Sequence, residues 1–415
     1  MIHHHRRRIR SGHLGILRQR KNVERKEGFV TVTRSKPCPY SGELILSTLN
    51  LSYTIYHPEL MNNNNNNNNN NNENNHHDDD DNHKKKKPLV VIHGGPGIPS
   101  DYLQPMAQYM KDRCVIFFDQ IGCGKSSRPK QIESYSIEMT VQDLFVLIQH
   151  LKLKDFHIYG HSFGAIVAYE FSKSLTLSSL SCEAVDTVEK YKEEKEEEST
   201  CDKIYYNNNN NNDKPRLLSM TLCSAPSNVR QVDDECKELM ESLRPRSNSE
   251  DSDIILSSSI EEESSNDDSQ ESTCDFSLLL FQKQFVCRTN HIISSNNNIN
   301  NYNGILPKPL QEAYNKRGDI WEGTDVILDY VAQPLSGRLS SNHTSMIPHI
   351  LLLKGEYDFV SDEYAFEGWM KLMNNHNSII TCQSLDDCSH YSMLENPQLH
   401  SFALNTFLSK IENML

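Results

Sequence analysis

Short runs of β-branched and aromatic residues alternate along this chain with stretches whose apolar residues recur at helical spacing. Runs with the length and composition of β-strands lie at residues 29–33, 44–56, 89–93, 114–119, 156–160, 217–223, 350–355 and 379–385. Stretches of helical period lie between the later runs, at residues 102–112, 140–151, 163–174, 362–373 and 397–411. This alternation predicts an α/β protein with a mostly parallel sheet, helices on both faces, and an antiparallel start made by the two opening strands.

Low-complexity tracts interrupt the alternation. They are rich in asparagine, in charged residues, or in serine and acids, and they lie at about residues 61–88, 182–213 and 244–275. None contains enough apolar side chains to offset the entropy of ordering it, so we predict disordered insertions. Residues 227–339 also break the rhythm, which predicts an inserted helical cap. The core then comprises residues 28–226 and 340–415, after a disordered basic arm at residues 1–27.

Composition narrows the function classes. The 415 residues include 42 Lys and Arg against 56 Asp and Glu, a net charge of −14, and so acidic a chain is a poor general binder of nucleic acid. Hydrophobic residues make up 36%, a low share that agrees with the predicted unfolded tracts. No apolar run is long enough to span a bilayer. Eleven Cys without a C-x-x-C pair, and no secretory apolar region, predict reduced thiols in a soluble, cytoplasmic protein.

The N-terminal segment has a charge pattern of its own. Its residues, MIHHHRRRIRSGHLGILRQRK, are rich in Arg, and no acid occurs before Glu24. Mitochondrial presequences have this pattern, although the segment is poor in Ser. A disordered basic tail on a cytoplasmic protein is the alternative interpretation.

The sequence GHSFG at residues 160–164 places Ser162 between an apolar strand and a helix. The two glycines permit a sharp turn that holds the hydroxyl above the sheet, as a nucleophilic serine requires. The amide of Phe163, at the start of the helix, is a candidate donor to a developing oxyanion. Gly95, in the glycine-rich turn HGGPG that follows an earlier strand, is the candidate for the second amide.

A serine alcohol is a poor nucleophile unless an imidazole takes its proton and a carboxylate orients that imidazole. Asp358 and His390 each follow a predicted strand, in the chain order Ser, Asp, His. Both therefore lie at carboxyl ends of strands, where open α/β sheets place their sites. Asp386 and Asp387 compete as the orienting carboxylate, but they are too near His390 in sequence for the usual arrangement.

This chemistry calls for no metal and no organic cofactor. The sequence GKS at residues 124–126 suggests a phosphate loop, but that motif would need a glycine where Asp119 stands. We therefore do not expect nucleotide binding.

In their order along the chain, these motifs resemble those of the proline iminopeptidases, serine peptidases of the α/β-hydrolase fold. The matching motifs are HGGPG at 93–97, DQIGCGKS at 119–126, GHSFG at 160–164, GEYD at 355–358 and CSH at 388–390. Segments at residues 281–288, 306–315 and 320–326 resemble the cap of that family. The resemblance covers most of the chain from about residue 28, outside the low-complexity tracts, and implies an α/β-hydrolase core with a helical cap.

The resemblance also implies a reaction: release of an N-terminal residue, typically proline, from small peptides whose free amine is bound by cap carboxylates. Asp325 falls where the family usually has Glu, Trp321 falls at its aromatic neighbour, and Glu322 is a second candidate for binding the amine. Ile121 stands where the family commonly has Arg, so a serine carboxylesterase or amidase of the same fold stays an alternative. A non-catalytic binding module is a further alternative. Nucleic acid and membranes are not expected partners, and the sequence carries no signal for an oligomeric state.

Overall fold

The structure is a computed structural model that describes residues 24–37, 44–61, 86–184, 215–243, 276–288, 325–334, 348–373 and 378–414. The arm up to residue 23 and most of each low-complexity tract lie outside these ranges, so their predicted disorder stays a prediction. Two candidate site residues, Trp321 and Glu322, also lie outside them.

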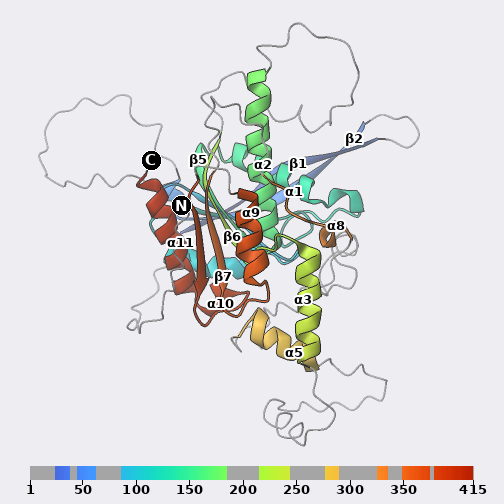
Figure 1. The fold of residues 1–415 in the computed structure, drawn as a ribbon. Coiled ribbons are helices and arrows are strands. Elements are labelled where there is room, and N and C mark those ends of the chain that lie inside the picture. Colours follow the sequence, from blue (N-terminus) through green and yellow to red (C-terminus); the bar gives the residue numbers. More distant parts are fainter. Residues whose placement is uncertain are drawn as a thin grey trace, which may run out of the picture.

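In the described part of the chain, the central sheet has the strand order β1-β2-β4-β3-β5-β6-β7-β8 (Figure 1). The strands are β1 (Arg25–Pro37), β2 (Leu44–Tyr56), β3 (Leu89–Ile92), β4 (Val115–Asp119), β5 (Asp155–His161), β6 (Arg216–Cys223), β7 (His349–Gly355) and β8 (Ile380–Leu385). β1 pairs antiparallel with β2 and β2 with β4, and all other neighbours are parallel. The predicted sheet is confirmed, except that β1 begins inside the predicted arm.

Helices cover both faces of the sheet, as predicted. The principal ones are η2 (Ser100–Tyr109), α1 (Ile137–His150), α2 (Phe163–Ala184), η8 (Glu363–Glu367), α9 (Gly368–Met373) and α11 (Pro397–Glu412). On β5, Phe156 packs against Phe171 of α2, whereas Tyr159 packs against His400 of α11. These two strand residues are three apart and therefore point to opposite faces. The helices α1 and α9 share the face of α2, and η2 shares the face of α11.

Two predicted helices differ in detail from the structure. The stretch 102–112 forms the 3₁₀-helix η2, with Pro105 inside it, because proline has no amide for the α-helical bond to the fourth residue back. The stretch 362–373 begins as a π-helix, η8, and becomes α-helical only at Gly368. Shorter elements include η1 (Pro58–Leu60), η3 (Ile132–Ser134) and α10 (Ser392–Glu395).

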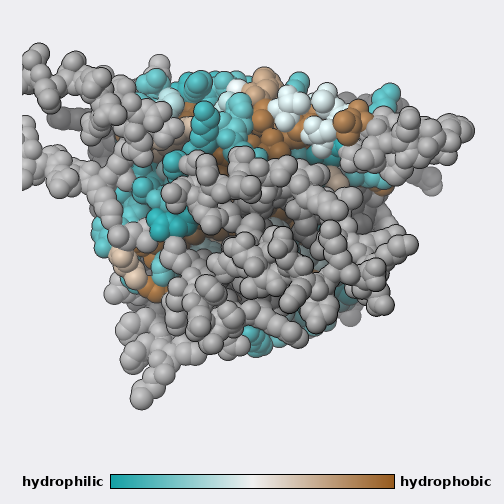
Figure 2. Space-filling model, turned by 90° about the horizontal axis from the view of Figure 1, so that it is seen from above, coloured by the Kyte–Doolittle hydropathy of each residue, from teal (hydrophilic) through white to brown (hydrophobic). Residues whose placement is uncertain are grey.

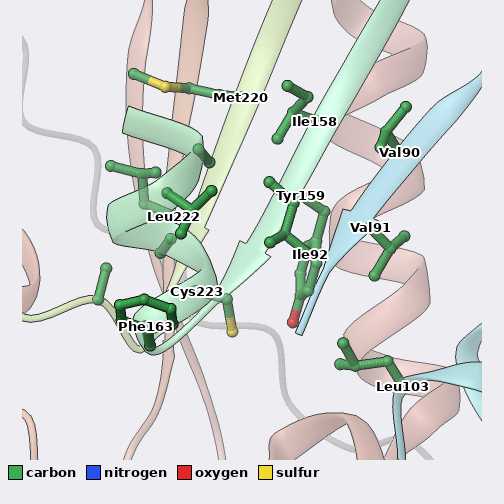
Figure 3. Packing of buried hydrophobic residues seen from close by; sticks show 14 of the residues in the cluster. Val90, Val91, Ile92, Leu103, Ile158, Tyr159, Phe163, Met220, Leu222 and Cys223 are labelled. Carbon is green, nitrogen blue, oxygen red and sulfur yellow. The ribbon is translucent and has the colours of Figure 1, made fainter. Parts of the chain in front are cut away.

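The apolar core lies between the middle strands and the two helical layers. Figure 3 shows side chains of β3, β5 and β6 in contact, among them Val90, Ile92, Ile158, Met220 and Leu222, all fully buried. Strands covered on both faces carry such continuous apolar runs rather than alternating ones. Each of these side chains contributes about 1.5–3 kcal/mol by leaving water, so the strands form a rigid base for the loops at their carboxyl ends.

Parts of the predicted cap region are described. They are α3 (Val229–Ser242), α5 (Phe276–Phe281), the π-helix η6 (Gln282–Val286) and α8 (Asp325–Leu328). In Figure 1, α3 and α5 extend beyond one end of the sheet. Seen from above, the described surface shows hydrophilic residues interspersed with smaller groups of hydrophobic ones (Figure 2). Within the described ranges, no helix is both long and apolar enough to cross a membrane.

A buried charge cluster holds α11 against the sheet. Glu412, near the end of α11, accepts hydrogen bonds from the guanidinium of Arg113 at 3.0 and 3.3 Å and from the Lys87 amide at 2.7 Å. The ring of His157, on β5, lies 3.3 Å from the same carboxylate. Burial opposes ionisation, but the hydrogen bond from His157 and the charge of Arg113 outweigh it, and the pKa of Glu412 is lowered from 4.5 to about 2. The ionised carboxylate therefore stabilises the folded state.

Replacing Glu412 by Gln is expected to lower the free energy of unfolding by about 3 kcal/mol, because Arg113 is then left buried without this carboxylate. A pKa that folding lowers gives stability that is complete above pH 4.5 and is lost as the pH falls toward 2. Urea unfolding followed by circular dichroism should thus show the variant and wild type converging over that interval. Glu241→Gln, at an exposed position of α3, is the control, and an equal loss there would contradict the prediction.

Candidate active site

Ser162 occupies a sharp turn between β5 and α2. Its φ angle is 53°, in the left-handed region, and its amide donates to the carbonyl of Cys223 at 2.8 Å. The flanking glycines are sterically required: a Cβ on Gly160 would lie 2.3 Å from the carbonyl oxygen of Gly164, and one on Gly164 would lie 2.4 Å from that of Ile92. Close backbone packing thus holds the half-buried Ser162 in a conformation that a non-glycine residue rarely adopts.

The glycine-rich turn after β3 lies directly against Ser162. A Cβ on Gly94 would be 3.1 Å from the Cβ of Ser162. Gly95 has a φ of +111°, and a Cβ there would lie 2.6 Å from the amide nitrogen of Gly97. This side of the serine is therefore lined by backbone. Phe163, the candidate for the other oxyanion amide, is the first residue of α2, and its side chain is buried in the core cluster (Figure 3).

A buried histidine joins this turn to the loop after β4. His93 accepts a hydrogen bond at Nε2 from the Gln120 amide at 2.9 Å, and its Nδ1 donates to the Gly94 carbonyl at 3.0 Å. The side-chain amide of Gln120 donates in return to the His93 carbonyl at 2.7 Å. Burial lowers the pKa of His93, so the ring is neutral, as this pattern of one donor and one acceptor requires.

Asp119 organises the same two loops. One carboxylate oxygen accepts from the amide and the hydroxyl of Ser100, at 3.0 and 2.8 Å, and the other accepts from the Lys125 amide at 3.0 Å. A Cβ on Gly124 would come within 2.1 Å of this carboxylate, so the glycine leaves room for it. Residues of the DQIGCGKS motif therefore connect the loop after β4 to the segment that follows β3.

Asp358 and His390 meet at the carboxyl ends of β7 and β8. His390 Nδ1 lies 2.9 Å from Asp358 Oδ1, and both side chains are almost completely buried. The Val360 amide donates to the same oxygen at 3.0 Å. Burial favours the neutral acid, but the charge of His390 and its hydrogen bond outweigh burial and lower the pKa of Asp358. Asp358 is therefore ionised at neutral pH, with its carboxylate at the Nδ1 side of the imidazole.

His390 lies beside the residue that precedes Ser162. The rings of His161 and His390 have centroids 4.8 Å apart, and His161 Nε2 lies 3.0 Å from the carbonyl oxygen of His390. The competing residue Asp387 is exposed. Its backbone amide donates to the side chain of Glu356 at 3.2 Å. Of the candidate acids, Asp358 is the one whose carboxylate meets the His390 ring.

A segment of the predicted cap contacts the same loop. The amides of His390 and Tyr391 donate to the carbonyls of Phe285 and Val286, at 3.1 and 3.0 Å. The carbonyl of His390 also lies 3.4 Å from the hydroxyl of Ser224. Of the predicted amine-binding residues, Asp325 is the first residue of α8, and the other two lie outside the described residues.

Sequence reasoning missed three residues around His390: Tyr102, His161 and Ser224. All three are buried, and Ser224 has a φ of 53° at the end of β6. The sequence carries a signal for two of these residues. His161 stands inside the GHSFG motif next to the serine, and Ser224 is a polar residue that directly follows an apolar strand, as Ser162 does. Tyr102 carries no comparable signal, because a single tyrosine in an amphipathic stretch is interpreted as a residue of the apolar core.

Comparisons with known proteins agree with this architecture. The family model described as the alpha/beta hydrolase fold matches residues 87–172, which include the Gly94–Gly95 turn and Ser162. The proline iminopeptidase of Heyndrickxia coagulans is 42% identical over 80 residues, 19% of this chain and 28% of that protein. The proline iminopeptidase of Saccharolobus solfataricus is 37% identical over 86 residues, 20% and 28% of the two chains. These alignments span less than a third of each relative.

Solved structures match over nearly the whole chain. A proline iminopeptidase from Mycobacterium smegmatis has a TM-score of 0.56 at 14% identity, covering 92% of this chain and 99% of that one. A proline iminopeptidase-related protein from Thermus thermophilus has a TM-score of 0.50 at 17% identity, covering 93% and 100%. At such identities the likeness shows the fold alone.

The sheet order, the turn at Ser162 and these matches define the class: the protein has the α/β-hydrolase fold. Within that class it is similar to the proline iminopeptidases, as its motifs predict.

Gly164→Ala is expected to lower the free energy of unfolding by about 3 kcal/mol, because the added methyl must displace the backbone of β3. Displacing it also moves the turn that carries Ser162, so labelling of the serine by a fluorophosphonate should slow. Urea unfolding and labelling kinetics measure the two effects. Lys173→Ala, on the same helix, removes only an ion pair with Glu170 and should cost about 0.5 kcal/mol or less. Equal effects of the two substitutions would contradict the steric argument.

Proposed function

We propose that the protein is a serine aminopeptidase that releases an N-terminal residue, with proline preferred, from small peptides. The observation that carries this proposal is the buried pair of Asp358 and His390, joined at 2.9 Å beside the turn of Ser162. The similarity to proline iminopeptidases supports the choice of substrate class. The partners are therefore small peptides with a free N-terminus.

In this proposal Ser162 Oγ attacks the carbonyl carbon of the first residue while His390 Nε2 takes the hydroxyl proton. Asp358, ionised and hydrogen-bonded to Nδ1, keeps the proton of the neutral ring on that nitrogen and stabilises the imidazolium that forms. The amides of Gly95 and Phe163 donate to the oxyanion. The C–N bond then breaks, and His390 returns its proton to the leaving amine. Water, deprotonated by His390, hydrolyses the acyl-enzyme and restores Ser162.

Selection of a free N-terminus requires a group that binds the amine. An α-amino group has a pKa near 8 and is largely protonated at neutral pH, so a desolvated carboxylate is its natural partner. We assign this role to Asp325 or Glu322, with Trp321 packing beside the substrate, on the basis of their places in the cap sequence. A serine carboxylesterase or amidase would have the same acyl-enzyme chemistry without this requirement.

Substrate specificity separates these functions. We expect hydrolysis of a prolyl arylamide with a free amine, and little or none of its N-acetylated form, because acetylation removes the charge that the cap carboxylate binds. Ser162→Ala should abolish the activity. Release of the arylamine is measured beside hydrolysis of a p-nitrophenyl ester. Hydrolysis of the ester without any requirement for a free amine would identify the protein as an esterase. If folded protein hydrolyses none of these substrates, the proposed chemistry is rejected.

Asp358→Asn is expected to reduce kcat by about 10³–10⁴-fold with a small change in KM, because a neutral amide no longer stabilises the imidazolium or fixes its tautomer. Steady-state kinetics on the best substrate measure this loss. Asp387→Asn is the matched control: it is exposed, lies three residues before His390, and has a positive φ that Asn tolerates. A variant of Asp387 that loses as much activity would make that residue the orienting acid instead.

A further inference from the structure

A chain of buried hydrogen bonds connects the glycine turn to the backbone of His390. The amide of Gly94 donates to the phenolic oxygen of Tyr102 at 2.8 Å. That oxygen lies 2.8 Å from His161 Nδ1, and His161 Nε2 lies 3.0 Å from the carbonyl oxygen of His390. The chain of hydrogen bonds joins the loop after β3, the last residue of β5 and the loop after β8, with Tyr102 supplied by η2.

The positions of the protons follow from the partners. An amide can only donate, so the Tyr102 oxygen accepts from Gly94 and its own hydroxyl hydrogen is left for His161 Nδ1. A carbonyl can only accept, so His161 Nε2 carries the ring hydrogen and donates it to His390. A protonated His161 would leave the Tyr102 hydroxyl hydrogen without an acceptor in this chain. The neutral ring protonated at Nε2 is thus the form in which every one of these hydrogen bonds is made.

The surroundings favour the same neutral ring. His161 is 1% exposed. Burial, together with the charge of His390, lowers the pKa of His161 well below its ordinary value, although the hydrogen bond to the His390 carbonyl opposes the shift. At neutral pH the ring therefore does not compete with His390 for a proton, and its function lies in its hydrogen bonds.

His390 is fixed at three points, of which His161 provides one. Asp358 holds the ring at Nδ1, Phe285 accepts from the backbone amide, and His161 donates to the backbone carbonyl. The Ser224 hydroxyl, at 3.4 Å, is a longer contact to the same carbonyl. A catalytic base must stay within about 0.5 Å of its productive position, so the carbonyl contact bears directly on the reach of Nε2 toward Ser162.

We infer that Tyr102 and His161 are positioning residues. Through the Gly94–Tyr102–His161–His390 hydrogen bonds they hold His390, the base, at a fixed position relative to the Gly94–Gly95 turn. This inference rests on the proposed function, because it takes His390 as the base and the Gly94–Gly95 turn as the oxyanion site. Each residue acts through another group and contacts neither the scissile bond nor the proton that is transferred from Ser162.

Apolar packing is the competing explanation for these two residues. The Tyr102 ring packs edge-on against Tyr391, with centroids 5.4 Å apart, and His161 lies 5.3 Å from the same ring. Phenylalanine at position 102 keeps this packing and removes only the hydroxyl. Tyr102→Phe therefore separates the hydrogen bonds from the packing.

The test uses three single substitutions and one double. Asn at position 161 can accept from Tyr102 but is too short to reach the His390 carbonyl, whereas the longer Gln places its amide nitrogen near the site of Nε2. Turnover is measured per active site, with sites counted by exhaustive fluorophosphonate labelling. We expect kcat to fall about tenfold or more in Tyr102→Phe and in His161→Asn, with KM within about twofold, and to recover in large part in His161→Gln. The double Tyr102→Phe/His161→Asn should lose no more than the poorer single variant, because both break one chain.

Several results would overturn the inference. Unchanged kcat per titrated site in both Tyr102→Phe and His161→Asn assigns the residues to packing, and so does a loss that His161→Gln does not reverse. Ser162→Ala and wild type are measured alongside. Wild type that hydrolyses its substrate, with activity lost in Ser162→Ala, upholds the proposed function whatever the positioning variants do. If Ser162→Ala stays active, the proposed function fails, and the inference fails with it.

A measurement on the unsubstituted protein is independent of turnover. With ¹⁵N-labelled histidine, the His161 ring nitrogens, assigned by their loss in His161→Gln, should report a neutral ring protonated at Nε2 at pH 7. A charged ring, or one protonated at Nδ1, would contradict the hydrogen-bond chain even if a variant failed to fold.

Discussion

The backbone of α2 approaches β5 and β3 so closely at Gly160 and Gly164 that neither position has room for a single methyl group. That approach fixes the start of α2, and with it the left-handed conformation of Ser162. The unfavourable backbone angle persists because the strands on either side cannot move: they are buried on both faces and packed at crystal-like density. The half-buried Ser162 is thus held by closely packed backbone segments of β3, β5 and α2.

Around this turn, polar groups do what apolar packing cannot, which is to set the positions of loops. Asp119 fastens the loops after β3 and β4 through backbone amides, and His93 with Gln120 forms a second fastening between them. Asp119 is half-buried, and His93 and Gln120 are buried. All three have hydrogen-bond partners, so desolvation is compensated and the loops have one favoured arrangement. Asp358 and His390 likewise join the loops after β7 and β8, through the hydrogen bond between Oδ1 and Nδ1.

Much of this could be predicted from the sequence, because strands covered on both faces leave a clear signal. The eight strands, and the places of Ser162, Asp358 and His390 at their carboxyl ends, follow from apolar runs and from the residues that come after them. Other features depend on contacts that are remote in sequence. Pro105 converts a helix of the expected period into a 3₁₀-helix, and Tyr102 meets His161 across 59 residues. The pairing of His390 with the Phe285 carbonyl joins segments more than a hundred residues apart, and no local pattern marks it.

The charge cluster at Glu412 has a consequence for the order of events during synthesis. Arg113 and His157 belong to the first half of the chain, in and beside strands at the centre of the sheet, whereas the carboxylate they share is supplied by α11. A nascent chain that has not yet extended past residue 412 can therefore bury Arg113 only without this counter-ion, at a cost of several kcal/mol. This face of the sheet can therefore be completed only after the ribosome has delivered α11, although the strands it covers are synthesised much earlier.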